Sequence, residues 1–176
     1  MPNLLDRLKG GDRRSVGEGY DVAVEILASA SEDGARSLLE IADGMGSDDV
    51  ILRSRCAHVL ASVSAERPDL LTPFQDEILD CWAPIAQWEV REQMSKVLPR
   101  LSWTPDRLGQ IYGLLQDYLE DRSSIVRTCA LQAMVDLLDQ APERRPEVVR
   151  TVETLTESGT AAMRARGRKL LKVLSG

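Results

Sequence analysis

Apolar and polar positions along the chain follow one pattern that occurs four times. Each copy has apolar or small residues at offsets 0, 4, 7, 8 and 11, and arginine at offset 1. At about 100° per residue, these offsets lie within an arc of about 100°, which is one face of an amphipathic helix. The copies start at Leu52, Val90, Val126 and Met163, roughly 37 residues apart. The pattern predicts four related helices whose buried faces are in register.

A second apolar-periodic segment precedes each of these helices, which predicts a helical hairpin in every repeat. The preceding segments cover residues 37–42, 70–85, 108–119 and 148–155. Gly, Pro, Asp and Ser separate the segments, as expected where helices end and begin. A repeat of this length is typical of a stacked helical array. The expected hairpins span about residues 33–65, 68–102, 104–140 and 142–176.

The position three residues before each register start should cap the helix N-terminus. It holds Asp49, Gln87, Ser123 and Thr160. Three of these side chains commonly accept backbone N–H bonds at that place. Residues 20–30 predict one more helix, either an N-terminal capping helix or half of a degenerate repeat. We expect residues 1–15 to be mobile or only partly helical, and residues 16–176 to form a single repeat domain.

Two of the marked helices, "EVREQMSKVL" and "IVRTCALQAM", resemble the second helix of HEAT repeats, in which arginine follows an apolar residue. The resemblance covers about residues 33–176. It implies an all-α protein, a right-handed α-α superhelix of the HEAT-like or armadillo type, with about four helix hairpins plus an N-terminal capping helix. Two features depart from the family. The Asp that usually precedes the Arg by six residues is present only as Asp121, and the usual first-helix proline has no regular position. The resemblance is therefore to a generic HEAT-like array.

The composition is that of an ordinary globular chain. Its 176 residues are 43% apolar, 28% charged and 4% aromatic, with a formal net charge of -6. The core must therefore be built from aliphatic side chains, which suit helices. No apolar run is long enough for a signal peptide or a membrane span. Cys56, Cys81 and Cys129 form no CxxC pair. We expect a cytoplasmic protein that does not enter the membrane.

Offsets 3 and 6 of the marked helices lie outside the apolar arc, and most of them hold polar or basic residues. In HEAT-like superhelices the second helix lines the concave side, so the resemblance implies that these positions form a mildly basic inner ridge. The alternative is an ordinary solvated helix face. The candidate binding residues are Arg55, His58, Gln93, Lys96, Gln132, Arg166 and Lys169.

The last marked helix, "MRARGRKLLKVL", contains basic residues and no acid. Arg168 and Lys172 stand at offsets 5 and 9, where the earlier repeats have small or apolar residues. We interpret the two as a polar outer face that caps the array, because no further repeat follows to cover it. Arg164 is the offset-1 arginine, and the resemblance implies that it braces neighbouring helices.

The sequence offers little for catalysis or metal binding. His58 is the single histidine, which excludes the several His-Glu pairs of the iron-dependent HEAT-like hydroxylases, and a zinc site would need clustered Cys and His. No phosphate-binding loop with a Gly-Lys-Ser/Thr signature and no nucleophile elbow occurs. We expect no enzyme activity, no cofactor and no metal.

These observations favour a non-catalytic helical-repeat scaffold for protein–protein interaction, with another protein or peptide bound on the concave face. The alternative is a nucleic-acid-binding HEAT-like protein, including a DNA-glycosylase-like one that would use Trp82, Trp88, Trp103, Asp106 and Arg91. A pI near 4.9 makes nucleic acid the less favoured partner. A third interpretation is a regulatory subunit.

Overall fold

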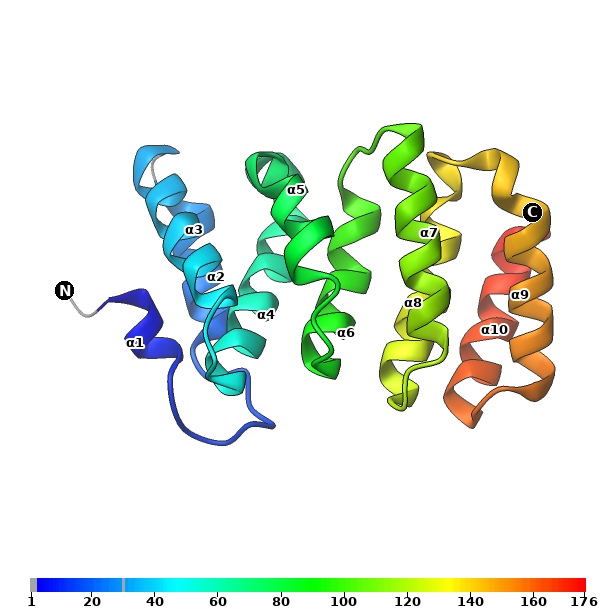
Figure 1. The fold of residues 1–176 in the computed structure, drawn as a ribbon, viewed down its shortest axis with the longest axis horizontal. Coiled ribbons are helices and arrows are strands. Elements are labelled where there is room, and N and C mark those ends of the chain that lie inside the picture. Colours follow the sequence, from blue (N-terminus) through cyan, green and yellow to red (C-terminus); the bar gives the residue numbers. More distant parts are fainter. Residues whose placement is uncertain (1–2, 30) are drawn as a thin grey trace. The chain divides into compact units, whose positions relative to one another are not determined.

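The structure is a computed structural model that describes residues 3–29 and 31–176. Over these residues it consists of helices joined by short loops, without a strand (Figure 1). Residues 1 and 2, at the start of the segment expected to be mobile, and residue 30, the last of the expected N-terminal helix, lie outside the described residues. The all-α prediction is therefore confirmed for the described part of the chain.

The chain divides into two compact units, Met1–Leu101 and Ser102–Gly176. The sequence predicts one repeat domain over residues 16–176, whereas the structure has two compact units. The boundary falls between the second and the third expected hairpin. We describe the two units separately.

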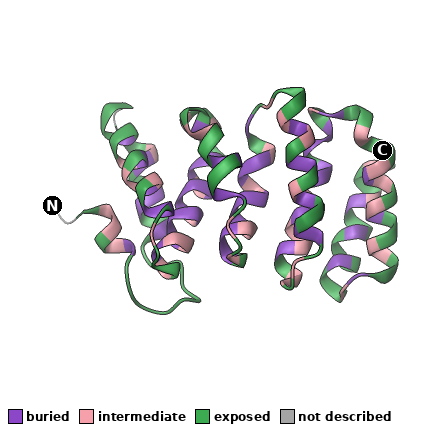
Figure 2. Cartoon of the chain, in the orientation of Figure 1, coloured by how far each residue is buried: buried purple, intermediate pink, exposed green. Residues whose placement is uncertain are grey.

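Unit 1 contains the N-terminal helices and the first two hairpins. In it α4 packs against α2, α3 and α6, and α1 packs against α3 and α4 (Figure 1). Buried positions are concentrated on α4, which has helices on several sides (Figure 2). The elements are α1 (Leu4–Leu8), α2 (Gly19–Ala28), α3 (Ser31–Met45), α4 (Val50–Glu66), the 3-10 helix η1 (Pro68–Phe74), α5 (Gln75–Glu77), the π-helical η2 (Ile78–Trp82), α6 (Trp88–Val97) and the 3-10 helix η3 (Leu98–Arg100).

Unit 2 contains the third and fourth hairpins. In it α7 packs on α8, α9 packs on α10, and α8 packs on α10. The buried Tyr112 of α7 donates a hydrogen bond to the carbonyl of Met134 on α8 at 3.0 Å, which ties the two helices of the third hairpin together. The elements are α7 (Pro105–Leu119), α8 (Ser124–Asp136), the 3-10 helices η4 (Leu137–Asp139) and η5 (Pro142–Arg144), α9 (Arg145–Ser158) and α10 (Ala161–Leu174).

The predicted register of the four marked helices is confirmed as a buried face. Every residue at offsets 0, 4, 7, 8 and 11 in α4, α6 to Leu101, α8 to Leu137 and α10 is buried, except Leu171 and Leu174, which are half-buried. At offset 4 of α10 the residue is Gly167, and a Cβ there would collide with Thr156 of α9. The small residue therefore allows α9 and α10 to approach closely.

The four expected N-cap residues are the N-caps of the structure. Asp49 accepts hydrogen bonds from the backbone N–H groups of Ile51 and Leu52, and Ser123 and Thr160 each accept one from their own helix. Gln87 makes no capping bond within the described part of the chain. Its side chain instead accepts a bond from Arg53 and donates one to the Val50 carbonyl, so it ties the start of α6 to α4.

The offset-1 arginines brace the loop of their own hairpin. Arg53, Arg91 and Arg164 donate to the carbonyls of Ser47, Ile85 and Gly159 at 3.1, 3.1 and 3.2 Å. These bonds satisfy carbonyl groups between two helices, where the backbone has no helical partner. Arg127 differs, because its Nε is buried without a hydrogen-bond partner among the described residues.

The segment predicted as a helix over residues 70–85 is irregular in the structure. It runs as a 3-10 helix, three α-helical residues and a π-helical turn. Pro73 lies inside this segment and has no N–H to donate, which removes an α-helical hydrogen bond and favours a break. The apolar periodicity correctly marked the buried Leu71, Ile78 and Trp82 but not the backbone geometry.

Candidate functional site

The seven candidate binding residues do not form a uniformly exposed ridge. In unit 1, Arg55 and Gln93 are buried and His58 and Lys96 are half-buried. In unit 2, Gln132 is half-buried and accepts a hydrogen bond from the exposed Arg166 at 2.9 Å, and Lys169 is exposed. The placement of Arg55 at a surface is wrong, because residues of the N-terminal segment cover it.

Residues 8–17, here called the docking segment, fold against α4 around the Arg55 guanidinium. Arg55 donates to the carbonyls of Leu8 at 2.9 Å, Lys9 at 3.5 Å, Asp12 at 3.2 Å and Ser15 at 3.2 Å. Leu8 itself is fully buried. Most of the docking segment had been expected to be mobile or only partly helical. The structure shows α1 followed by a loop whose main chain is held by a single arginine.

The local sequence of the docking segment suits this path. Gly10, Gly11 and Gly17 have φ values of 69°, 78° and 54°, in the left-handed region that favours glycine. At Gly17 a Cβ would also lie 2.8 Å from Arg55 Cζ, so only glycine lets the chain pass over the guanidinium. The side chains of Asp12 and Ser15 accept bonds from the N–H groups two residues on, which stabilises the turns.

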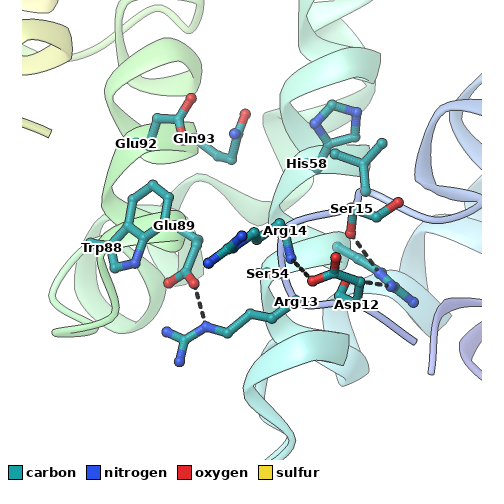
Figure 3. A pocket seen from close by; sticks show the side chains of 12 residues that line it. Asp12, Arg13, Arg14, Ser15, Ser54, His58, Trp88, Glu89, Glu92 and Gln93 are labelled. Atoms are coloured by element: carbon teal, nitrogen blue, oxygen red, sulfur yellow. Dashed lines mark hydrogen bonds and ion pairs between the residues drawn. The ribbon is translucent and has the colours of Figure 1, made fainter. Parts of the chain in front are cut away.

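A cavity of about 430 Å³ lies between the docking segment, α4 and α6. Figure 3 shows its lining side chains, with the loop residues Asp12 to Ser15 on one side and Trp88, Glu89 and Glu92 of α6 on the other. Arg55 and His58 of α4 also line it. The cavity therefore includes three of the seven candidates, Arg55, His58 and Gln93.

Glu89 is the main charged contact between α6 and the docking segment. Its Oε1 accepts a hydrogen bond from Arg13 Nε at 2.6 Å, and the residue is 8% exposed. Its Oε2 is buried and has no hydrogen-bond partner within residues 3–29 and 31–176. Burial alone would raise the pKa of Glu89, but the bond from Arg13, with smaller contributions from the backbone N–H of Glu89 and from Gln87, holds the pKa below its ordinary value. The carboxylate is therefore ionised at neutral pH.

His58 and its neighbours set the charge at the other side of the cavity. Burial, with a smaller contribution from the positive charge of Lys96, lowers the pKa of His58, so the imidazole is neutral at neutral pH. Lys96 in turn pairs with Glu92 at 2.9 Å. Glu89 and Glu92, together with Trp88, which is 38% exposed, give α6 an acidic and aromatic edge facing the cavity.

The structure also bears on thiol reactivity, metal binding and membrane spanning. Burial raises the pKa of the Cys56 thiol to about 12, which leaves it protonated and unreactive. Across the described residues, no three His, Cys, Asp or Glu side chains gather in a way that could hold a metal ion. Within the same residues, no helix is both long enough and apolar enough to cross a membrane.

The sequence analysis missed Arg13, Arg14 and Glu89 as members of a site, although it had noted Trp88. Residues 1–15 are predicted from the sequence to be mobile or only partly helical, so Arg13 and Arg14 have no predicted contact. A usable signal was present in the apolar Leu8, which is unusual in a solvated tail, whereas the glycines flanking "DRRSV" are common in such tails. Of the other tryptophans, Trp82 is buried and Trp103 is half-buried.

Comparison of the chain with protein-family models, with curated proteins and with solved structures gives no match.

Proposed function

We propose that the chain is a non-catalytic helical-repeat scaffold that binds an extended segment of another protein on the surface formed by α4 and α6. In this proposal the four hairpins form a right-handed, HEAT-like superhelix whose second helices line the concave side. The common register and the loop-bracing arginines of three hairpins support that arrangement. Solenoids of this kind offer preformed surfaces, so little ordering entropy is lost on binding.

The observation that carries the proposal is the docking segment itself. From the end of α1 the chain runs as a loop of turns over α4 and α6 and is held mainly through its carbonyl groups by Arg55. Recognition of carbonyl groups does not depend on side chains, so the same donors suit the main-chain carbonyls of a segment of another protein. The ion pair of Glu89 with Arg13 adds a contact that does depend on the side chain.

Photo-cross-linking tests the proposal. Trp88, which faces the cavity, is replaced by the photoreactive aromatic residue p-benzoylphenylalanine. The matched control carries the same residue at Tyr20, which is 65% exposed and does not line the cavity. In extract of the native cell we expect a protein adduct at position 88 that survives nuclease treatment and is missing at position 20. Equal labelling at both positions, or adducts that nuclease removes, would contradict the proposal.

A second candidate function is nucleic-acid binding through α10. Its basic side chains are exposed, and residues 159–176 contain no acid. They are Arg164, Arg166, Arg168, Lys169 and Lys172. Phosphate binding releases counterions, so affinity for duplex DNA should fall by a slope of about -0.9 per phosphate contact in log–log salt titrations. With a net charge of -6 we expect no binding at roughly 0.15 M salt. Submicromolar, salt-sensitive binding that is lost when these residues are changed to Glu would make this the leading function.

A further inference from the structure

The buried carboxylate of Glu89 is only half satisfied. Arg13 donates one short hydrogen bond to Oε1, whereas no hydrogen bond of ordinary geometry reaches Oε2 in the described part of the chain, and Gln87 and the backbone N–H of Glu89 stabilise the carboxylate more weakly. An ionised oxygen that is buried without a donor costs free energy, more so than a neutral group. A ligand that displaces the docking segment and brings a second donor to Oε2 would remove this cost.

The surroundings of Glu89 define the chemistry of that ligand. Trp88 offers an aromatic face, and Glu92, which is paired with Lys96, adds a second carboxylate at the same edge of α6. A planar guanidinium can stack on an indole and place two N–H groups on one carboxylate, which an ammonium cannot do equally well. The side chains that line the cavity thus suit arginine better than lysine.

The chain's own arginines occupy this site incompletely. Arg13 uses only Nε, and its side chain is 51% exposed. Arg14 extends from the docking segment toward the side of the cavity where Trp88 and Glu89 lie (Figure 3). The guanidinium of a partner arginine could donate hydrogen bonds to both carboxylate oxygens of Glu89, whereas the tethered Arg13 donates to one.

We propose that Trp88, Glu89 and Glu92 form a specificity pocket for an arginine side chain of the partner protein, and that Arg13 is a built-in competitor for it. This inference rests on the proposed function, because Arg55 would donate hydrogen bonds to main-chain carbonyls of the partner beside the pocket. The partner is then an extended segment that contains arginine. Binding exchanges the tethered segment for the partner's segment on the same donors and acceptors.

The tether sets how strongly Arg13 competes with a partner arginine. A short flexible connection holds Arg13 near Glu89 at an effective concentration of about millimolar. A free segment of similar intrinsic affinity therefore binds the wild type weakly. Removing the arginines of the docking segment should free the acidic side chains of α6 from their competitor, while the carbonyl bonds of the segment to Arg55 stay in place.

The test uses full-length protein and a labelled peptide with the sequence of residues 9–18, KGGDRRSVGE. Fluorescence polarisation compares the wild type with the double variant Arg13→Ala, Arg14→Ala. We expect the double variant to bind the peptide at least about tenfold more tightly, since effective-concentration effects of this kind reach about 100-fold or more. A peptide with both arginines replaced by lysine should bind the double variant at least about tenfold more weakly, because the bidentate geometry is lost.

Glu89→Gln in the double variant should lower peptide affinity at least about tenfold, comparable with losing a charged hydrogen-bond partner. The matched control is Glu77→Gln on α5, which removes an exposed carboxylate and should change nothing. Circular dichroism melting checks folding, and Trp88→Ala replaces Glu89→Gln if that variant does not fold.

Equal affinity for the arginine and lysine peptides, or unchanged affinity after Glu89→Gln, would overturn the pocket. The same is true if the double variant binds no peptide. The cross-linking experiment at position 88 is independent of arginine, so a positive result there with a negative one here leaves the proposed function standing and removes only its specificity.

Discussion

Replacing Arg55 by Met should release the docking segment while α4 stays folded. Methionine is unbranched and fills a similar volume, but it has no donor for the four carbonyls. Lys9, Asp12 and Ser15 are exposed, so their carbonyls regain water when the segment leaves. Only the bond to the Leu8 carbonyl is buried. Hydrogen bonds from a charged donor contribute about 1.5–3 kcal/mol each when buried and less when exposed. We therefore expect docking to weaken by about 2–4 kcal/mol.

That loss corresponds to a roughly 30- to 1,000-fold shift in the docking equilibrium, at tenfold per 1.4 kcal/mol. Limited trypsin cleavage after Arg13 and Arg14 measures it, because cleavage follows the population of the open segment when opening is fast. The matched control is Arg67→Met, which removes an exposed arginine paired with Asp69 and should leave the cleavage rate unchanged. A global melt is recorded for each variant. An unchanged cleavage rate in Arg55→Met together with a lower melting temperature would show that Arg55 supports the core and not the segment.

Three further outcomes follow from burial and packing. Cys81 is exposed and should react with a thiol reagent at once, whereas Cys56, with its raised pKa, should react only at the rate of unfolding; early reaction of Cys56 would contradict its burial. The lowered pKa of His58 means that the unfolded chain binds its proton first, so stability is full above the ordinary pKa of 6.5 and is lost as the pH falls from that value through the lower pKa of the folded state. Between pH 7.5 and 5.5, urea titrations should show a smaller loss of unfolding free energy for His58→Gln than for the wild type. An equal loss would refute the lowered pKa of His58. Gly167→Ala should destabilise the fold by about 1–3 kcal/mol through overlap with Thr156, and adding Thr156→Ala should recover part of it in a double-mutant cycle; simple additivity would exclude the clash.

The helical parts of the fold were predictable because their causes are local. Offsets along one helix decide which side chains are buried, and Asp49, Ser123 and Thr160 cap the helices that follow them. Pro73 indicates locally that a regular α-helix is disfavoured, but helix propensity alone does not decide between 3-10 and π geometry. Leu171 occupies a core offset and is only half-buried, because burial also depends on what lies beside the helix.

The candidate site was less predictable because its contacts join distant parts of the chain. Arg55 stands at an offset that holds Gln, Cys and Arg in the other repeats, and nothing within its own helix indicates that it is covered. Its partners lie 40 to 47 residues earlier. The same holds for Arg13 and Glu89, which are 76 residues apart. Helical periodicity carries no information about such pairs.

This difference in sequence separation has a consequence for the order of folding. The bonds of Arg53 and Arg91 to their hairpin loops span 6 residues, so the hairpins can close early. The bonds of Arg55 require a loop of 40 or more residues that already contains α2 and α3. Because closure entropy must be overcome before distant contacts form, the docking segment should attach last, with φ-values near zero at its positions. The segment nearest the start of the chain is then the final part to become native.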